Sequence, residues 1–129
     1  MYLLDTDVIV EYLRGDKKVI DKIKELSEKG LSATTISISE LYYGIYKSSK
    51  VDENTKKVID FFSGVTILNV NLAVCKLFGK IKADLKSRGK LAGDFDILIA
   101  SITIANNLIL VTGNEKHFKD IKSLKLMGL

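Results

Sequence analysis

Short apolar runs alternate along the chain with longer stretches in which apolar residues recur every three or four positions. A short apolar run is typical of a buried strand, and the longer spacing is typical of a helix with one buried face. The runs predict strands at residues 2–5, 31–35, 65–70, 108–111 and, at an edge, 124–127. The spacing predicts helices at residues 8–14, 17–29, 37–48, 52–62, 71–87 and 96–106, with a helical turn at 115–118.

Strands separated by one or two helices predict an α/β fold, in which helices flank a mainly parallel central sheet in three layers. The length of 129 residues predicts a single domain, residues 1–129. The longest apolar tract, residues 97–105, is interrupted by Ser101 and Thr103 and predicts a buried helix rather than a membrane span. Since no basic and then apolar signal segment opens the chain, we expect a cytoplasmic protein with no membrane partner.

The net charge of +4 is concentrated in one predicted helix. Between Cys75 and Ala92 the only acid is Asp84, and the cations are Lys76, Lys80, Lys82, Lys86, Arg88 and Lys90. Such a helix could steer a polyanion toward the acids that follow it. A solvated amphipathic helix accounts for the same spacing, so both interpretations stay open.

Several kinds of chemistry find no support in the sequence. Cys75 is the only cysteine and lies among apolar residues, which predicts a small core residue and no internal disulfide. His117 is the only histidine and has no apparent partner, so we expect a surface or packing residue. These counts argue against a Cys/His zinc site and against a nucleophile–histidine pair. The G-x-x-x-x-G-K-[ST] loop of many ATPases is also absent.

Four acidic residues stand where a predicted strand ends or a predicted helix begins: Asp5, Glu40, Asp94 and Asp96. In parallel sheets, ligands bind beyond the carboxyl ends of the strands. We therefore expect these acids to gather at that edge of the sheet. Carboxylate oxygens suit hard cations, which predicts a Mg²⁺ or Mn²⁺ site serving phosphodiester chemistry.

Each acid also has an ordinary structural explanation. Asp5, like the two residues after it, could cap a helix. Glu40 completes the S-x-x-E form of a capping box that begins at Ser37. Asp94 and Asp96 fall in the first turn of a helix, where acids complement the helix dipole. A shared metal site explains all four with one cause.

Four sequence blocks together resemble the signature blocks of PIN-domain ribonucleases. They are LLDTD at residues 3–7, SELYYG at 39–44, GDFDILIA at 93–100 and LVTGNEKHF at 110–118. The order and spacing of the blocks and the length of the chain are similar to those of VapC toxins from type II toxin–antitoxin pairs. The resemblance covers nearly the whole chain.

The resemblance implies a PIN-like fold and a Mg²⁺- or Mn²⁺-dependent endoribonuclease that hydrolyses RNA. It also implies a homodimer that is held inactive by a small VapB-like antitoxin protein. Carried over by position, Asp5 and Asp96 are the metal ligands, Glu40 is the third acid, and Asp94 is an added first-turn carboxylate. Asn114 stands where the last block often carries an acid, so the number of metal ions, one or two, stays open.

Two other functions remain as alternatives. Residues 5–8, with the sequence DTDV, also resemble the D-x-D-x-[TV] motif of haloacid-dehalogenase-like phosphatases, in which the first aspartate is a nucleophile. The spacing of the later acids and the short chain argue against that family. The other alternative is a PIN-like module that binds RNA or protein without cutting. Tyr42, Tyr43 and Tyr46 could stack on RNA bases, or they could pack in the core or at a dimer interface.

Overall fold

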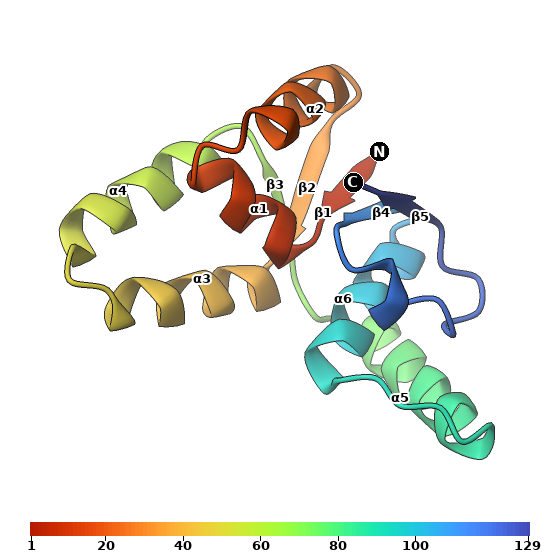
Figure 1. Ribbon diagram of the computed structural model, residues 1–129. Coiled ribbons are helices and arrows are strands. Elements are labelled where there is room, and N and C mark those ends of the chain that lie inside the picture. Colours follow the sequence, from red (N-terminus) through yellow and green to blue (C-terminus); the bar gives the residue numbers. More distant parts are fainter.

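The computed structural model describes all 129 residues, and its centre is a five-stranded sheet (Figure 1). The strands are β1 (Tyr2–Leu4), β2 (Leu31–Thr34), β3 (Thr66–Leu68), β4 (Ile109–Thr112) and β5 (Leu126–Gly128). Their order across the sheet is β3-β2-β1-β4-β5, and every neighbouring pair is parallel. The predicted strands and the predicted parallel sheet are therefore confirmed.

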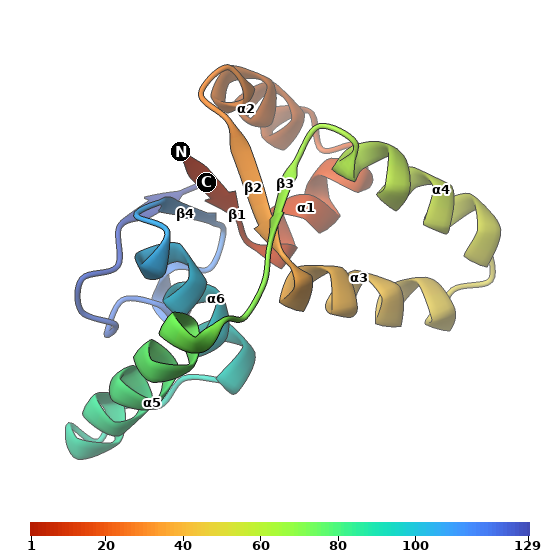
Figure 2. The ribbon, with the colours of Figure 1, turned by 180° about the vertical axis from the view of Figure 1, so that it is seen from behind.

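Six α-helices cover the sheet, four on one face and two on the other (Figures 1 and 2). The first face carries α1 (Thr6–Leu13), α2 (Lys17–Ser27), α3 (Thr35–Lys47) and α4 (Val51–Phe62). The second carries α5 (Leu72–Ser87) and α6 (Asp94–Ala105), and a short 3-10 helix, η1 (Glu115–His117), follows β4. The predicted three-layer α/β fold is confirmed.

Two hydrophobic cores hold these layers together, because successive side chains of a strand point to opposite faces of the sheet. Leu4 of the central strand packs into the core beneath α1–α4, and its neighbour Leu3 packs into the core beneath α5 and α6. Both side chains are completely buried. Strand β1 is thus fixed from both faces, and this sets where the next residue, Asp5, begins.

The order in which the strands are added across the sheet reverses at β1. After β1 the chain builds β2 and β3 on one side and later adds β4 and β5 on the other. Ligands of open α/β sheets bind at such a switch point, outside the carboxyl ends of the strands. The Asp5 amide donates to the Val111 carbonyl at 2.9 Å, which joins the ends of β1 and β4 at this point.

Helix α6 is the buried helix that the apolar tract predicted. The Ser101 hydroxyl donates to the Ile97 carbonyl at 2.7 Å, and the Thr103 hydroxyl donates to the Ile99 carbonyl at 2.8 Å. These bonds satisfy both hydroxyls inside the helix itself, so they are buried without an unpaired polar atom. No helix of the protein combines the length and the apolarity needed to cross a membrane.

One alternative explanation, the capping box at Glu40, and one local prediction, the core position of Cys75, are wrong. Helix α3 begins at Thr35, and the Thr34 hydroxyl caps it by accepting from the Ser37 amide at 3.0 Å. Ser37 is therefore not a cap and Glu40 lies beyond the first turn, so the capping box does not form. Cys75 is exposed rather than part of the core, because the helix turns it about 100° away from the buried Val74.

Candidate functional site

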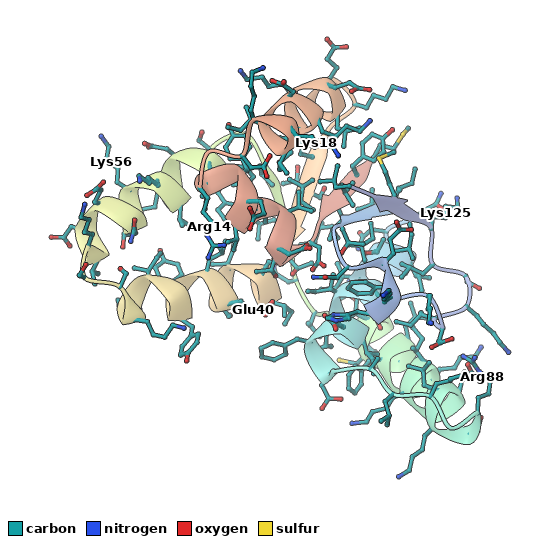
Figure 3. All side chains as sticks on the ribbon, in the orientation of Figure 1. Arg14, Lys18, Glu40, Lys56, Arg88 and Lys125 are labelled. Carbon is teal, nitrogen blue, oxygen red and sulfur yellow. The ribbon has the colours of Figure 1, made fainter.

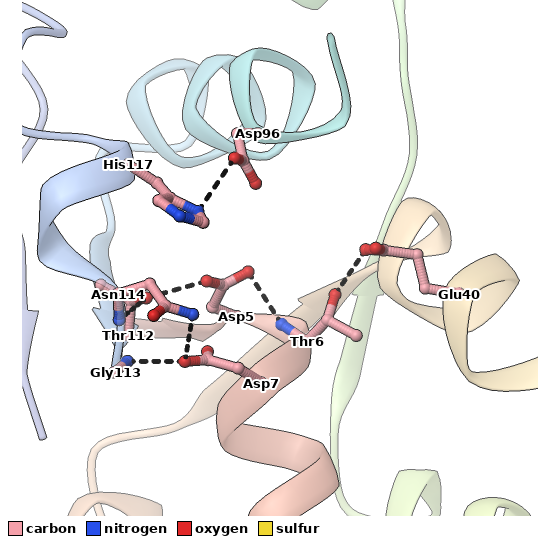
Figure 4. Close-up of polar contacts among 9 residues, drawn as sticks. All are labelled: Asp5, Thr6, Asp7, Glu40, Asp96, Thr112, Gly113, Asn114 and His117. Atoms are coloured by element: carbon pink, nitrogen blue, oxygen red, sulfur yellow. Dashed lines mark hydrogen bonds and ion pairs between the residues drawn. The ribbon is translucent and has the colours of Figure 1, made fainter. Parts of the chain in front are cut away.

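Asp5 lies at the switch point, directly after β1, and its side chain is held on both oxygens (Figure 4). The Thr6 amide donates to Oδ1 at 2.8 Å, and the Thr112 hydroxyl donates to Oδ2 at 2.8 Å. Asp5 is thus the N-cap of α1, as the ordinary explanation proposed, yet it is also only 6% exposed. A cap of a surface helix needs no such burial, so capping alone does not explain its position.

Burial raises the pKa of the Asp5 carboxyl to about 7. The Thr112 hydrogen bond acts in the opposite direction, and the negative charge of Asp7 raises the pKa further. The fold therefore holds a carboxylate where its charge is unfavourable without a nearby cation. Such a perturbed group at the switch point of the sheet is a candidate for function.

Asp7 belongs to the same centre, although its place in the sequence predicted only a possible helix cap. Its Oδ2 accepts from the Gly113 amide at 3.0 Å and from Asn114 Nδ2 at 3.1 Å (Figure 4). A Cβ atom at position 113 would lie 2.7 Å from Asp7 Oδ2, so the close approach requires glycine. The sequence signal was the second acid of the DTD block, but its partner stands 106 residues away.

Asp96 faces Asp5 from the first turn of α6 (Figure 4). Burial raises the pKa of the Asp96 carboxyl, the neighbouring His117 lowers it, and the charge of Asp7 raises it again. His117 Nδ1 lies 3.4 Å from Asp96 Oδ2. The expectation that His117 has no partner is therefore wrong, although its side chain is at the surface as expected.

Glu40 reaches the centre through Thr6. The Thr6 hydroxyl donates to Glu40 Oε1 at 2.7 Å and lies 2.8 Å from the Ser37 hydroxyl. These contacts join the first turn of α1 to α3 and set the Glu40 carboxylate beside the edge of the site (Figures 3 and 4). Thr6 and Ser37 were not expected to have this role.

Asp94 is held elsewhere. Its Oδ1 accepts from Lys82 Nζ of α5 at 2.8 Å, and 59% of its side chain is exposed. The structure thus brings Asp5, Asp7 and Asp96 together, with Glu40 tied to them through Thr6. A role for Asp94 in this centre stays a prediction.

The types of donor atom at the centre fit a hard divalent cation. No group of three or more His, Cys, Asp or Glu side chains is close enough to hold a metal ion by itself. Magnesium, however, is usually held by one or two carboxylates and keeps several waters. Asp5, Asp7, Asp96 and Asn114 offer oxygen ligands, and the raised pKa of Asp5 and of Asp96 shows two carboxylates whose charge a cation would stabilise.

Comparison with known families and curated proteins identifies related chains. Residues 2–124 match the family model described as PIN domain. The chain is 34% identical to Ribonuclease VapC2 of Haemophilus influenzae, over 96% of this chain and 94% of that protein. It is also 34% identical to Ribonuclease VapC2 of Rickettsia felis, over 98% of this chain and 96% of that protein. The tRNA(fMet)-specific endonuclease VapC of Shigella flexneri is 26% identical to this chain, over 96% of this chain and 94% of that protein.

Solved structures show the same fold in complexes. VapBC2 from Rickettsia felis, bound to a DNA fragment from its promoter, superposes with a TM-score of 0.92 at 31% identity, covering 98% of this chain and 97% of that one. VapBC-1 from nontypeable Haemophilus influenzae superposes with a TM-score of 0.89 at 27% identity, covering 98% of this chain and 96% of that one.

Proposed function

The chain belongs to the PIN-domain family and is a relative of the VapC ribonucleases, and from this premise we propose that it is a divalent-metal-dependent endoribonuclease and the toxin of a toxin–antitoxin pair. One observation supports the reaction most strongly: Asp5 and Asp96 face each other at the carboxyl ends of the strands, and burial raises the pKa of both carboxyls. Such carboxylates are suited to hold a cation.

Asp5 and Asp96 are the proposed ligands of Mg²⁺ or Mn²⁺. When bound, the cation supplies positive charge against the developing charge of the phosphodiester and makes a water more acidic. The protein holds the two ligands in place. Thr112 and the Thr6 amide fix the Asp5 carboxylate, and His117 contacts Asp96. Asp7 is held by Gly113 and Asn114, which aligns it beside Asp5.

Glu40 is the proposed third acid. The Thr6 hydroxyl fixes its orientation, and a carboxylate at the edge of the site can accept a proton from an attacking water or hold a water in place. Asp94 is proposed to assist from the first turn of α6, where it pairs with Lys82.

The phosphatase alternative is not favoured. It requires Asp5 to attack phosphorus, and the spacing of the later acids, Asp94 and Asp96, does not suit the phosphatase family. The related proteins are also ribonucleases. A PIN-like module that binds without cutting would lack metal-dependent cleavage, so the cleavage assay below tests it directly.

We also propose a small VapB-like antitoxin as partner, because the structural relatives are VapBC complexes. A basic side chain of that partner would complement the acidic centre, and arginine matches carboxylate geometry well. A homodimer is proposed through the tyrosine-bearing face of α3, where Tyr43 and Tyr46 are 67% and 70% exposed. Sedimentation of the protein at micromolar concentration tests the dimer, and a monomer would contradict it.

Incubation of the purified protein with single-stranded RNA tests the proposed reaction. We expect cleavage with Mg²⁺ or Mn²⁺, no cleavage with excess chelator, and recovery when the metal is restored. Undiminished cleavage in chelator would refute the metal requirement. A failure to cut any RNA with either metal would favour the binding module instead.

A further inference from the structure

A hollow of about 320 Å³ adjoins the acidic centre on the side of α6. Its walls come from the loop before α6, from the first turn of α6 and from η1. They are Leu91, Ala92, Gly93, Asp96, Lys116 and His117. Because Asp96 belongs both to this wall and to the acidic centre, a molecule in the hollow lies directly beside the proposed reaction site.

The size and chemistry of the hollow fit one nucleotide. Its volume is near the lower end of the roughly 300–1,000 Å³ typical of small-ligand sites, which leaves room for a single such unit. Lys116 brings a positive charge, and Leu91 is an apolar side chain with 96% of its surface exposed. A nucleotide combines a negative phosphate with a flat base whose faces are apolar. The single acid in the wall is Asp96, whose charge the proposed cation would offset.

We propose that this hollow binds the nucleotide next to the scissile phosphodiester of a single-stranded RNA. Lys116 lies toward its phosphate, and Leu91 and Ala92 lie against its base. The inference rests on the proposed ribonuclease function and adds to it the side of the acidic centre along which the RNA runs. It also makes Leu91 and Lys116 binding residues.

Paired lysine variants test the phosphate contact. Lys116→Gln removes a charge from the hollow, and Lys119→Gln removes the same charge from an exposed position that is not part of its wall. We expect KM for a single-stranded oligoribonucleotide to rise several-fold in Lys116→Gln, with kcat nearly unchanged. The slope of log kcat/KM against log salt concentration should also fall by about 0.7 to 1, the value for one lost phosphate contact. Lys119→Gln should behave like wild type in both measurements.

Abasic substrates test the base contact. An oligoribonucleotide that wild type cuts at one site is prepared with a single abasic residue at each position around the cut. Loss of the base removes its apolar contact with Leu91 and Ala92, so the wild-type rate should fall about tenfold at one flanking position. Leu91→Ser should show little further loss at that position. Leu72→Ser changes an equally apolar, 72% exposed residue outside the hollow and should retain the full penalty.

The possible outcomes distinguish a failure of the proposed subsite from a failure of the proposed function. Cleavage of RNA by wild type, with Lys116→Gln matching Lys119→Gln and an unchanged abasic profile in Leu91→Ser, would overturn the subsite alone. The Phe95 side chain of α6 is 52% exposed. If the abasic penalty were lost in Phe95→Ala instead, the base would lie on the outer surface of α6, and this result would also overturn the proposed subsite. Absence of any cleavage by wild type with Mg²⁺ or Mn²⁺ would overturn the proposed function and the subsite together.

Discussion

The Thr112 hydroxyl donates a 2.8 Å hydrogen bond to Asp5 Oδ2, joining the ends of two neighbouring strands across 107 residues of sequence. The same hydroxyl accepts from the Asn114 amide at 3.0 Å. Thr112 therefore links the buried carboxylate to the loop whose Gly113 amide holds Asp7. The positions of Asp5 and Asp7 depend on the junction of β1 and β4, so small changes at this junction should affect the site more than the fold.

The pKa of Asp5 predicts how stability of the metal-free protein varies with pH. Between its ordinary value of 3.8 and about 7, the unfolded chain releases the Asp5 proton while the folded protein retains it. The folded state then binds more protons, so the free energy of unfolding falls as pH rises through this window. We expect wild type to lose stability relative to Asp5→Asn between about pH 4 and pH 7, by on the order of a few kcal/mol.

Thermal or urea unfolding of both proteins in chelator, at several pH values, measures this difference. Comparison with Asp5→Asn removes most of the contribution of other groups, such as Asp84, whose lowered pKa acts with the opposite sign at lower pH. A difference in stability that does not change with pH would show that the Asp5 carboxyl is not held protonated by the fold.

Gly113→Ala should damage the site while leaving the fold intact. The added Cβ would lie 2.7 Å from Asp7 Oδ2, so the Asp7 side chain must move and lose its bonds from Gly113 and Asn114. Disturbed positioning of groups around a metal typically costs about 10- to 100-fold in affinity or activity. Gly79→Ala is the control, because nothing lies within 4 Å of a Cβ atom there. Equal activity of the two variants would contradict the role given to Asp7.

Thr6→Val tests whether Thr6 positions Glu40. Valine keeps the shape of threonine but cannot donate to Glu40 Oε1. We expect Thr6→Val to lower the rate of RNA cleavage about tenfold. If Thr6 acts through Glu40, most of this loss is already present in Glu40→Gln. The double variant should then be little worse than either single variant. Thr35→Val, at the start of α3, should be close to wild type. Fully additive losses would mean that Thr6 and Glu40 act independently.

Much of this architecture could be predicted from the sequence, because apolar periodicity reports which face of each element is buried. The strands and the order of helices follow from it, and so does the placing of Asp5 and Asp96 at strand and helix ends. The ordinary explanation of Glu40, a capping box, came from a local motif. The helix starts earlier, at Thr35, and that start depends on where β2 ends.

The rest of the site depends on contacts between distant parts of the chain. Asp7 gains its partners from a loop 106 residues away, and His117 meets Asp96 only because η1 lies against α6. Cys75 was assigned to the core from its apolar neighbours, yet a single step along a helix separates a buried face from an exposed one. No local pattern contains these relationships.

Metal should reverse the stability ranking of wild type and Asp96→Asn. Burial and the charge of Asp7 make the Asp96 carboxylate unfavourable, so in chelator the variant should equal or exceed wild type in stability. Mg²⁺ at a hundredfold excess over Kd should stabilise wild type by about 2.7 kcal/mol and the variant far less. Melts at constant ionic strength measure both. If Asp96 were only a first-turn acid, the variant would be less stable by about 0.3 to 1 kcal/mol with or without metal.

The most direct measurement is the rate of RNA cleavage by a matched pair of variants in saturating Mg²⁺. Asp96→Asn and Asp52→Asn remove the same charge from the first turn of a helix, α6 in one case and α4 in the other. We predict that Asp96→Asn abolishes cleavage while remaining folded by circular dichroism, and that Asp52→Asn cleaves at the wild-type rate. Cleavage by folded Asp96→Asn at the rate of Asp52→Asn would contradict the proposed metal-dependent centre.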